Sequence, residues 1–487
     1  MVTATMAEVE MSMHTAKSDH LVIDIQRRLT AFQEYTNADP PQYSIYRIPS
    51  HIRKNNEYYY EPRMVSIGPY HRNKEHLCAM EVHKLRYLGK LCNQKDGILR
   101  DFIGEIRNAE ADIRACYCES VDLEEGDQFV EMMLVDGCFI IKLFFNWLFN
   151  EPDAACDAGW ALPLLISDLL MLENQIPFFV LTKIYNIYTF GCVDPPSDAH
   201  GDYRPSFLTL AADILHETCK TNVERAKVPE AGVAIKHLLH LFYLLFVPAP
   251  EYALTPRQIN VKIKGKESRT NCLPLLQKRN RREFAGSSKF SEKIESPRVI
   301  KSAIELKEYG VILKKKEKFA SFLDISFERG ILEVPRITIE GCSRSRLLNL
   351  IAFEQCSGGA DVDPIKKPLS SYAVFMACLM NMSQDVIVLE KAGILENNLA
   401  NSEEGAKFFH QVRECAHIDF DNHYLKQVFV EVVEYCEAFW PKHRARLRHE
   451  YFSSPWTISS LMVAMLVLIM AIFHTIGFIL TTFLKKY

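Results

Sequence analysis

The most restrictive feature of the sequence is an uncharged stretch near its carboxyl end. Residues 457–484 read TISSLMVAMLVLIMAIFHTIGFILTTFL and contain no Lys, Arg, Asp or Glu. An α-helix rises about 1.5 Å per residue, so this stretch is long enough to cross a hydrocarbon layer of roughly 30 Å. We therefore predict a single transmembrane helix from Ile458 to Phe483. The alternative is a buried core helix, but core helices are seldom so long and so free of charge.

The residues that flank this stretch favour one orientation in a bilayer. Trp456 precedes it, where an indole prefers the headgroup region. Four basic residues lie just upstream and only two lie downstream, so the positive-inside rule places the amino-terminal side in the cytosol. These residues are Lys442, Arg444, Arg446 and Arg448 upstream, and Lys485 and Lys486 downstream.

The amino terminus is expected to be a disordered leader over residues 1–20. It has neither the basic start nor the apolar centre of a signal peptide. Insertion would then depend on the last helix, as in a tail anchor. We expect a single-pass protein of the plasma membrane or an endomembrane, with its body in the cytosol.

The composition limits what kind of globular body the chain can form in front of this predicted anchor. The chain has 487 residues, 48% of them hydrophobic, so a sizeable core is expected. A net charge of -4 predicts no general attraction to nucleic acid. The 14 Cys include no CxxC pair, which favours reduced thiols in the cytosol. Asn381 begins a possible glycosylation site, Asn-Met-Ser, whose use would reverse that topology.

The first part of the body is predicted to combine helices with two short strands. Apolar spacing predicts a helix over 21–35, and Ser44–Ile48 and Met64–Ile67 resemble strands. A second helix is predicted from His76 to Cys92. Its core stripe is expected to comprise Leu85, Leu88 and Cys92, with Lys84 pointing elsewhere.

Two apolar helices in the middle of the chain bring carboxylates into the predicted core. They cover 127–149 and 162–185 and contain Asp136, Asp168 and Glu173. These groups, or His71 in the loop 66–71, could supply acid–base catalysis through raised pKa values. The alternative is that each carboxylate caps a helix, accepts a backbone hydrogen bond or pairs with a base. Spacing alone cannot bring two of them together, so we designate no catalytic residue.

No metal or cofactor site is predicted. His237 and His240 are three residues apart and could bind a metal, but no third ligand stands at motif spacing. They are interpreted as packing residues. The sequence also lacks the GxGxxG, P-loop and GxSxG motifs.

A basic insertion is predicted at about 261–301. It holds twelve Lys and Arg against four Glu and has little apolar periodicity, so we expect a flexible segment. Its densest part could pass for a nuclear signal, could meet anionic lipid or an acidic partner, or could simply be a solvated linker. That part contains Lys278, Arg279, Arg281 and Arg282.

The remainder of the body is predicted to be helical except for one hairpin. Alternating apolar residues over 322–334, with a turn at Gly330, predict two strands that join the amino-terminal strands in a small sheet. The fold class is therefore mainly α with a small β element. A helical globular domain covers 21–452, and a transmembrane helix covers 457–484. The remaining predicted helices cover 237–247, 344–356, 369–382, 384–391, 402–416 and 424–448.

Several motifs, in order along the chain, resemble the plant "domain of unknown function 247" family. They include IYRIPSHIRK, YEPRMVSIGPYHR, EMMLVDGCFIIKLF, LLISDLLMLENQIPFFVL, FLDISFERGILEVP and YCEAFWPKHRARLRHEYFSSPW. One departure is HLLHLF, in which His240 stands where the family pattern leads us to expect an acid.

The resemblance implies a plant protein anchored at its carboxyl end. Members in grasses are linked to self-incompatibility as pollen-side determinants. It thus implies a recognition or signalling protein that acts through an unknown protein partner. A membrane-tethered enzyme using Asp136, Asp168, Glu173 or His71 is the alternative, and a stress or defence adaptor is a third possibility.

Overall fold

The structure is a computed structural model of the whole chain. The leader 1–20 and the insertion residues Lys278, Arg279, Arg281 and Arg282 lie outside the described residues. The described residues are 21–30, 43–54, 56–93, 95–119, 126–151, 159–191, 193, 205–219, 233–247, 296–319, 321–356, 367–438, 443 and 455–484.

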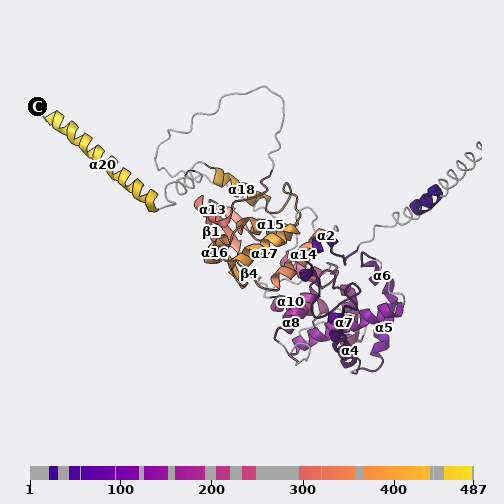
Figure 1. Cartoon of the computed structure of the whole chain (residues 1–487). Coiled ribbons are helices and arrows are strands. Elements are labelled where there is room, and N and C mark those ends of the chain that lie inside the picture. Colours follow the sequence, from indigo (N-terminus) through magenta and orange to yellow (C-terminus); the bar gives the residue numbers. More distant parts are fainter. Residues whose placement is uncertain are drawn as a thin grey trace, which may run out of the picture.

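The body consists of two neighbouring lobes that share one hydrophobic core (Figure 1). The amino-terminal lobe comprises the described residues from 43 to 247, and the carboxy-terminal lobe those from 296 to 438. The mainly helical class predicted from the sequence is confirmed. The first lobe contains α2 (Ser50–Arg53), α3 (Glu57–Tyr60), η1 (Glu75–Leu77), α4 (Cys78–Cys92), α5 (Ile98–Asn108), α6 (Glu110–Ala115), α7 (Gly126–Leu148), α8 (Ala161–Leu169), α9 (Phe178–Phe190), α10 (Phe207–Thr218) and α11 (Leu238–Phe246).

The carboxy-terminal lobe adds the strands to the fold. Its elements are α13 (Ala303–Glu308), β1 (Ile312–Lys316), β2 (Ser326–Glu328), β3 (Ile331–Pro335), β4 (Ile337–Ile339), α14 (Ser343–Cys356), α15 (Pro368–Leu379), α16 (Ser383–Lys391), β5 (Leu395–Asn397), α17 (Ser402–Glu414) and α18 (Lys426–Glu437).

Helix α7 forms the centre of the amino-terminal lobe. It packs against α4, α5, α9 and α10, and it is apolar enough to be buried on most sides. Lys142 near its end keeps an ion pair with Glu151, 2.7 Å from Nζ to Oε2. A buried helix of this kind is expected where neighbours cover all of its faces.

The predicted hairpin is confirmed, but the predicted sheet partners are wrong. Strands β2 and β3 pair antiparallel, and Gly330 turns between them with a φ of 82°. The third strand is β1, which pairs parallel to β3. No strand is predicted at β1, which ends in three successive lysines and has no buried residue to mark an inward face. A second sheet pairs β4 with β5 in parallel.

The predicted core stripe of α4 is also wrong. Leu85 is 55% exposed, whereas Lys84 is 1% exposed. The inward face consists of Met80, Lys84, Tyr87 and Leu91. The pattern misleads because the buried Lys84 ammonium has an anionic partner, which apolar periodicity does not register.

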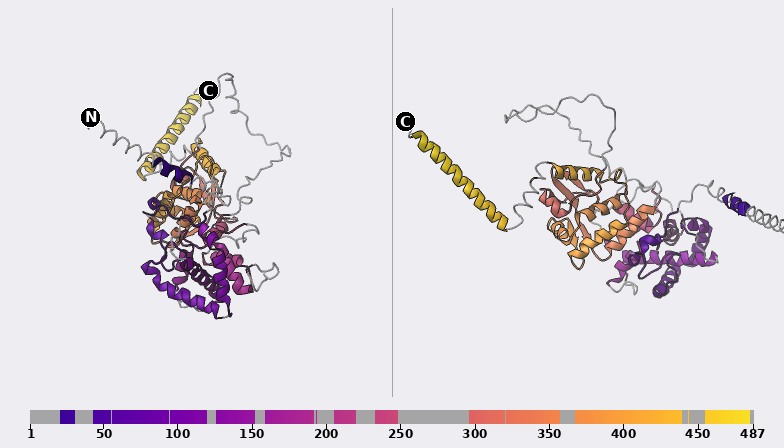
Figure 2. Two further views of the ribbon diagram at one scale, coloured as in Figure 1. Left: turned by 90° about the vertical axis from the view of Figure 1, so that its right-hand side faces the viewer. Right: turned by 45° about the horizontal axis from the view of Figure 1, so that its top comes forward.

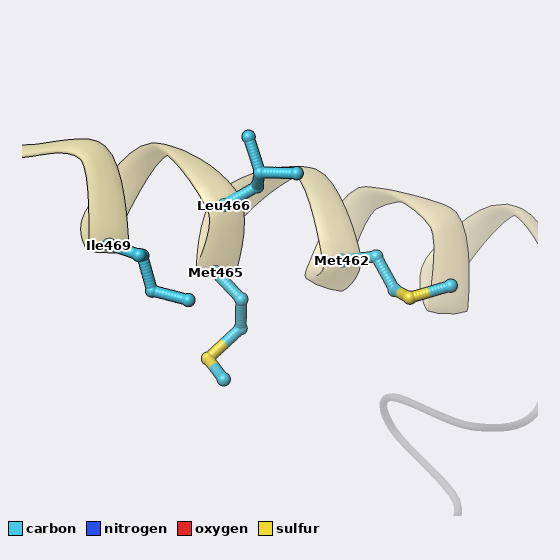
Figure 3. Close-up of a pocket in the computed structure, with 4 residues that line it drawn as sticks. All are labelled: Met462, Met465, Leu466 and Ile469. Carbon is cyan, nitrogen blue, oxygen red and sulfur yellow. The ribbon is translucent and has the colours of Figure 1, made fainter.

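Two further helices stand away from both lobes (Figures 1 and 2). One covers residues 21–30, within the predicted 21–35. The other, α20 (Pro455–Leu484), runs through the uncharged stretch. Its exposed side chains Met462, Met465, Leu466 and Ile469 line a shallow apolar hollow along the helix (Figure 3).

In the described part of the chain, no single helix is both long and apolar enough to cross a membrane. The apolar run Met462–Gly477 in α20 is too short by this measure. Helices α15 and α16, bent by 103°, satisfy length and composition only as a pair. The residues of α15 from Leu369 to Leu379 are buried within the protein. The side chains of Ile458 and Phe483 lie outside the described residues.

Candidate functional site

The polar residues that stood out in the sequence meet at one turn. We call residues 168–175, between the end of α8 and the start of α9, the polar turn. It packs against residues 43–74, which we call the N-terminal segment and which include α2 and α3. Asp168, Glu173, Asn174 and Gln175 are all at most 2% exposed, so each needs a partner inside the protein.

Asp168 binds the backbone of the N-terminal segment. Its Oδ2 accepts hydrogen bonds from the amides of Arg63, Met64 and Val65, at 3.0, 2.6 and 3.1 Å. Burial raises the pKa of the Asp168 carboxyl to about 6, although these three donors lower it. A carboxylate that holds three successive amides fixes the course of the chain at this point.

The strands predicted at Ser44–Ile48 and Met64–Ile67 are therefore wrong. In the first, only Ile45 forms a β-bridge, with Tyr117. In the second, side chains of the polar turn take the amides that a neighbouring strand would have bound. Asn174 completes this arrangement, since its Oδ1 accepts from Ile67 N at 2.6 Å. The amides of Met64, Val65 and Ile67 are therefore bound by side chains and not by a neighbouring strand.

A buried ion pair lies beside the end of the segment. Asp136 Oδ1 accepts from Lys84 Nζ at 2.7 Å, and its Oδ2 accepts from Gly68 N at 2.8 Å. Lys84 also donates to Ser66 O at 2.5 Å. Although burial lowers it, the Asp136 carboxylate raises the pKa of Lys84 above its ordinary value. Gly68 has a φ of 72°, and a Cβ there would lie 2.5 Å from Gln175 O, so the approach requires glycine.

Five charged or titratable side chains form a cluster at the other end of the turn. Arg53 bonds to both Glu61 and Glu173, and Lys74 bonds to Glu61. His71 lies between the two acids, with Nδ1 3.5 Å from Glu61 Oε2 and Nε2 3.3 Å from Glu173 Oε2. We call these five residues the charge cluster. It joins α2, the end of α3 and the polar turn.

Opposing influences set the pKa of Glu173. Burial alone would raise it, but interactions with His71 and Arg53 lower the pKa of the Glu173 carboxyl to about 2. Its Oε1 also accepts from Ile48 N at 2.6 Å. Glu173 therefore remains ionised and serves as an anchor for the N-terminal segment.

The same segment connects the two lobes. Asn349 of α14 accepts from Leu172 N at 2.9 Å and donates to Tyr59 O at 3.0 Å. Ser345 donates to the same carbonyl at 2.7 Å, and Arg344 donates to the Tyr59 hydroxyl at 2.6 Å. Helix α3 is thus held by hydrogen bonds from α14, in the carboxy-terminal lobe.

The structure favours the structural role over the catalytic role for the predicted acids. Asp136, Asp168 and Glu173 line one stretch of the N-terminal segment, and each accepts hydrogen bonds from backbone or basic donors. Only Glu173 lies within ion-pair distance of His71, 3.3 Å away. This arrangement can fix the course of a backbone and hold Asp136, Asp168 and Glu173 away from water.

The two histidines of α11 pack as predicted. His237 caps the helix, since its Nδ1 accepts from His240 N at 3.1 Å, and its Nε2 lies 2.9 Å from Ser44 O. His240 Nδ1 accepts from Lys236 N at 3.1 Å, and its ring packs against Phe353. Within the described ranges, no group of three or more His, Cys, Asp or Glu side chains could hold a metal ion.

Asn381 lies in the bend between α15 and α16, and it is exposed. Its backbone carbonyl is 3.4 Å from His410 Nε2. The site is therefore open to solvent, and its use as a glycosylation site stays a prediction.

Sequence reasoning misses four residues of this site. It places Lys84 on the outer face of its helix, and it does not single out Arg53, Asn174 or Asn349. One signal was available, because the run Glu-Asn-Gln at 173–175 lies between apolar stretches and therefore predicts buried polar contacts. The identity of the distant partners had no such signal.

Comparison with known protein families matches the chain to a plant family. The family described as "Plant protein of unknown function", the domain of unknown function 247, matches residues 45–470. The chain belongs to this family. The resemblance inferred from the sequence motifs is thereby confirmed, and the match spans both lobes and reaches into α20.

Two relatives of this family member come from Arabidopsis thaliana. A UPF0481 protein is 28% identical over 450 residues, which cover 88% of this chain and 85% of the relative. A putative UPF0481 protein is 22% identical over 521 residues, covering 97% of each. No solved structure matches the chain.

Proposed function

We propose that this family member is a membrane-anchored recognition or signalling protein that acts through protein–protein interaction. The observation that carries the proposal is α20, a helix of 30 residues with an uncharged sequence. The lipid bilayer is its first partner, and a protein bound by the body is the second.

The side chains of α20 support a lipid environment. Met462 and Phe473 are 69% and 70% exposed, and neighbouring aliphatic residues are similarly uncovered. Exposed apolar surface costs about 25 cal/mol per Å² in water, so a row of such residues needs a cover. A bilayer supplies one along the full length of the helix, and Trp456 stands at the end where an interfacial aromatic is expected.

The buried acids of the body favour a binding role over a catalytic one. Its buried acids are engaged in holding the N-terminal segment, and Asp168 has three amide donors on one oxygen. A catalytic carboxylate needs access to substrate. We therefore favour recognition over the membrane-tethered enzyme.

The more specific proposal is a pollen-side self-incompatibility determinant with its body in the cytosol. Reduced thiols support the cytosolic side, since the eleven cysteines that the structure describes are all free. Specificity would then lie in the two ranges that the sequence predicts to be loops, 186–205 and 251–300. In the first of these ranges α9 continues to Phe190, so the predicted loop is shorter than expected.

Protease protection of sealed membrane vesicles tests anchoring and topology together. The full chain carries an epitope at each end, and glycosylation is scored at Asn381 with Asn381→Gln as the matched control. We expect alkaline carbonate to leave the chain in the pellet, external protease to digest the body, and Asn381 to stay unmodified. Release by carbonate would refute the anchor. A protected, glycosylated body would retain the anchor and reverse the topology.

Exchanging 251–300 between alleles tests recognition. If this range carries specificity, the exchanged protein follows the donor's mating type, whereas exchange of a buried helix such as α15 serves as a folding control. Unchanged mating specificity in a folded, membrane-bound exchange protein would contradict the assignment.

A further inference from the structure

Within the charge cluster, His71 is the side chain whose unperturbed pKa lies near neutral pH. It is 1% exposed, and neither ring nitrogen has hydrogen-bond geometry to a partner. Glu61 Oε2 lies 3.5 Å from Nδ1 and Glu173 Oε2 lies 3.3 Å from Nε2. The imidazole is thus held between two acids without a settled hydrogen bond to either.

Neither protonation state of this imidazole satisfies both its hydrogen-bonding needs and the charge balance around it. A neutral ring has one N–H donor and one lone pair, so with a carboxylate at each nitrogen the lone pair faces an acceptor. A protonated ring would donate on both sides. However, Arg53 and Lys74 already neutralise Glu61 and Glu173, so the added proton places an uncompensated positive charge on the buried imidazole.

The groups that face His71 come from every neighbouring part of the segment. Arg53 belongs to α2, Glu61 follows α3, Lys74 precedes η1, and Glu173 belongs to the polar turn. Burial lowers the pKa of His71 below its ordinary value, and it outweighs the opposing attraction of Glu173 and Glu61. The neutral ring is therefore the form that fits the closed arrangement.

We propose that His71 forms a pH-sensitive contact. Its protonation loosens the N-terminal segment from the polar turn. The segment is bound on one side by Glu173, through Arg53 and Ile48 N, and on the other by α14, through Tyr59. Opening at the charge cluster therefore weakens the connection between the lobes as well.

The sign of the effect follows from the two states. In an opened segment His71 regains an ordinary pKa of about 6.5. Above that value neither state binds the proton, and pH has no effect through this group. Below that value the released segment binds the proton before the bound one does. The equilibrium constant for binding the segment to the polar turn therefore falls by up to about tenfold per pH unit, until His71 also titrates in the bound state.

Hydrogen exchange of the full chain in detergent micelles tests the proposal. Protection of the 48–61 peptide, corrected for the intrinsic exchange rate, is measured from pH 5 to 7.5 in the wild type, His71→Asn and His76→Asn. His76 is a matched control, because it lies in η1 directly after this segment and is exposed, with Nε2 3.0 Å from Pro62 O. We expect protection to fall below about pH 6.5 in the wild type and in His76→Asn, and the fall to be lost in His71→Asn.

Two results would contradict the proposed role of His71. One is a wild-type protection that does not change with pH; the other is the same fall in His71→Asn as in the wild type. If His71→Asn fails to fold, the imidazole carbon resonance of His71 in the wild type decides instead. A titration midpoint of His71 below about pH 6.5 supports the proposed role, and a midpoint at or above that pH refutes it.

Discussion

Glu173 in the amino-terminal lobe and Glu354 in the carboxy-terminal lobe are both buried, yet they are supported by different partners. Glu173 faces Arg53 and His71 and accepts one backbone amide. Glu354 accepts only neutral donors, namely the Tyr243 hydroxyl at 3.1 Å, Leu369 N at 2.9 Å, and Ser370 through its amide at 2.8 Å and its hydroxyl at 2.6 Å.

This difference reverses the direction of the two pKa shifts. Ionic partners lower the pKa of Glu173 to about 2 against the effect of burial, whereas burial raises the pKa of Glu354 against the effect of its donors. In these two acids the opposite directions of the pKa shifts go with the charge of the partners, ionic for Glu173 and neutral for Glu354.

The largest effect is expected where ionic support is removed and the acid remains. Lys84→Met leaves the buried Asp136 with one described hydrogen bond, from Gly68 N. We expect a loss of about 4 kcal/mol in the free energy of unfolding, measured by urea denaturation. The double variant Lys84→Met/Asp136→Leu should recover part of it, because no charge is left buried. A single variant as stable as the wild type would contradict the ionic account of this lobe.

A smaller loss is expected when an acid with neutral donors only is truncated. Asp168→Ala leaves the amides of Arg63, Met64 and Val65 without their acceptor. We expect about 3 kcal/mol of destabilisation, and less in Asp168→Asn, which keeps an acceptor oxygen. The measurement is urea denaturation, with hydrogen exchange of the 62–68 peptide to locate the change. Equal losses in the Ala and Asn variants would show that the amides do not depend on the acceptor.

The pH dependence of stability should separate Glu173 from Glu354. Because the pKa of Glu173 is lowered in the folded state, its contribution is present above about 4.5 and is lost as the pH falls toward about 2. Because the pKa of Glu354 is raised, its protonation favours the folded state as the pH falls through that raised pKa toward about 4.5. Glu173→Gln and Glu354→Gln should therefore change the pH profile of urea denaturation in opposite directions. Parallel changes would refute the contrast.

The smallest effect is expected for an exposed ion pair. Arg107 and Asp127 are 2.5 Å apart, but their side chains are 58% and 80% exposed. Arg107→Ala should lower stability by less than about 0.5 kcal/mol, because solvent screens the pair. The same denaturation series measures it. A loss comparable to that of Lys84→Met would mean that ionic contacts matter here irrespective of burial.

Part of the candidate site was accessible from the sequence. Asp136, Asp168 and Glu173 stood out because acids within apolar helices must find partners. The donors were not accessible, because the amides of 63–68 lie about a hundred positions away in the chain from the polar turn. The same lack of long-range information explains the false strands, since local composition does not show which distant groups bind the amides of a segment.

The sequence by itself determined several helices, among them α4, α7, α14 and α17, together with the β2–β3 hairpin, the family and the uncharged character of 457–484; it did not predict α5, α6 or α10, and α8 and α9 replace the one helix predicted over 162–185. The features that it determined depend on local periodicity, turn residues and motifs, which neighbouring residues carry. Only the tertiary structure decided that Lys84 points inward, that β1 rather than an amino-terminal strand completes the sheet, and that His71 lies between Glu61 and Glu173. The physical reason is that the desolvation of a charged or polar group is offset by partners from distant segments, and only folding brings those partners together.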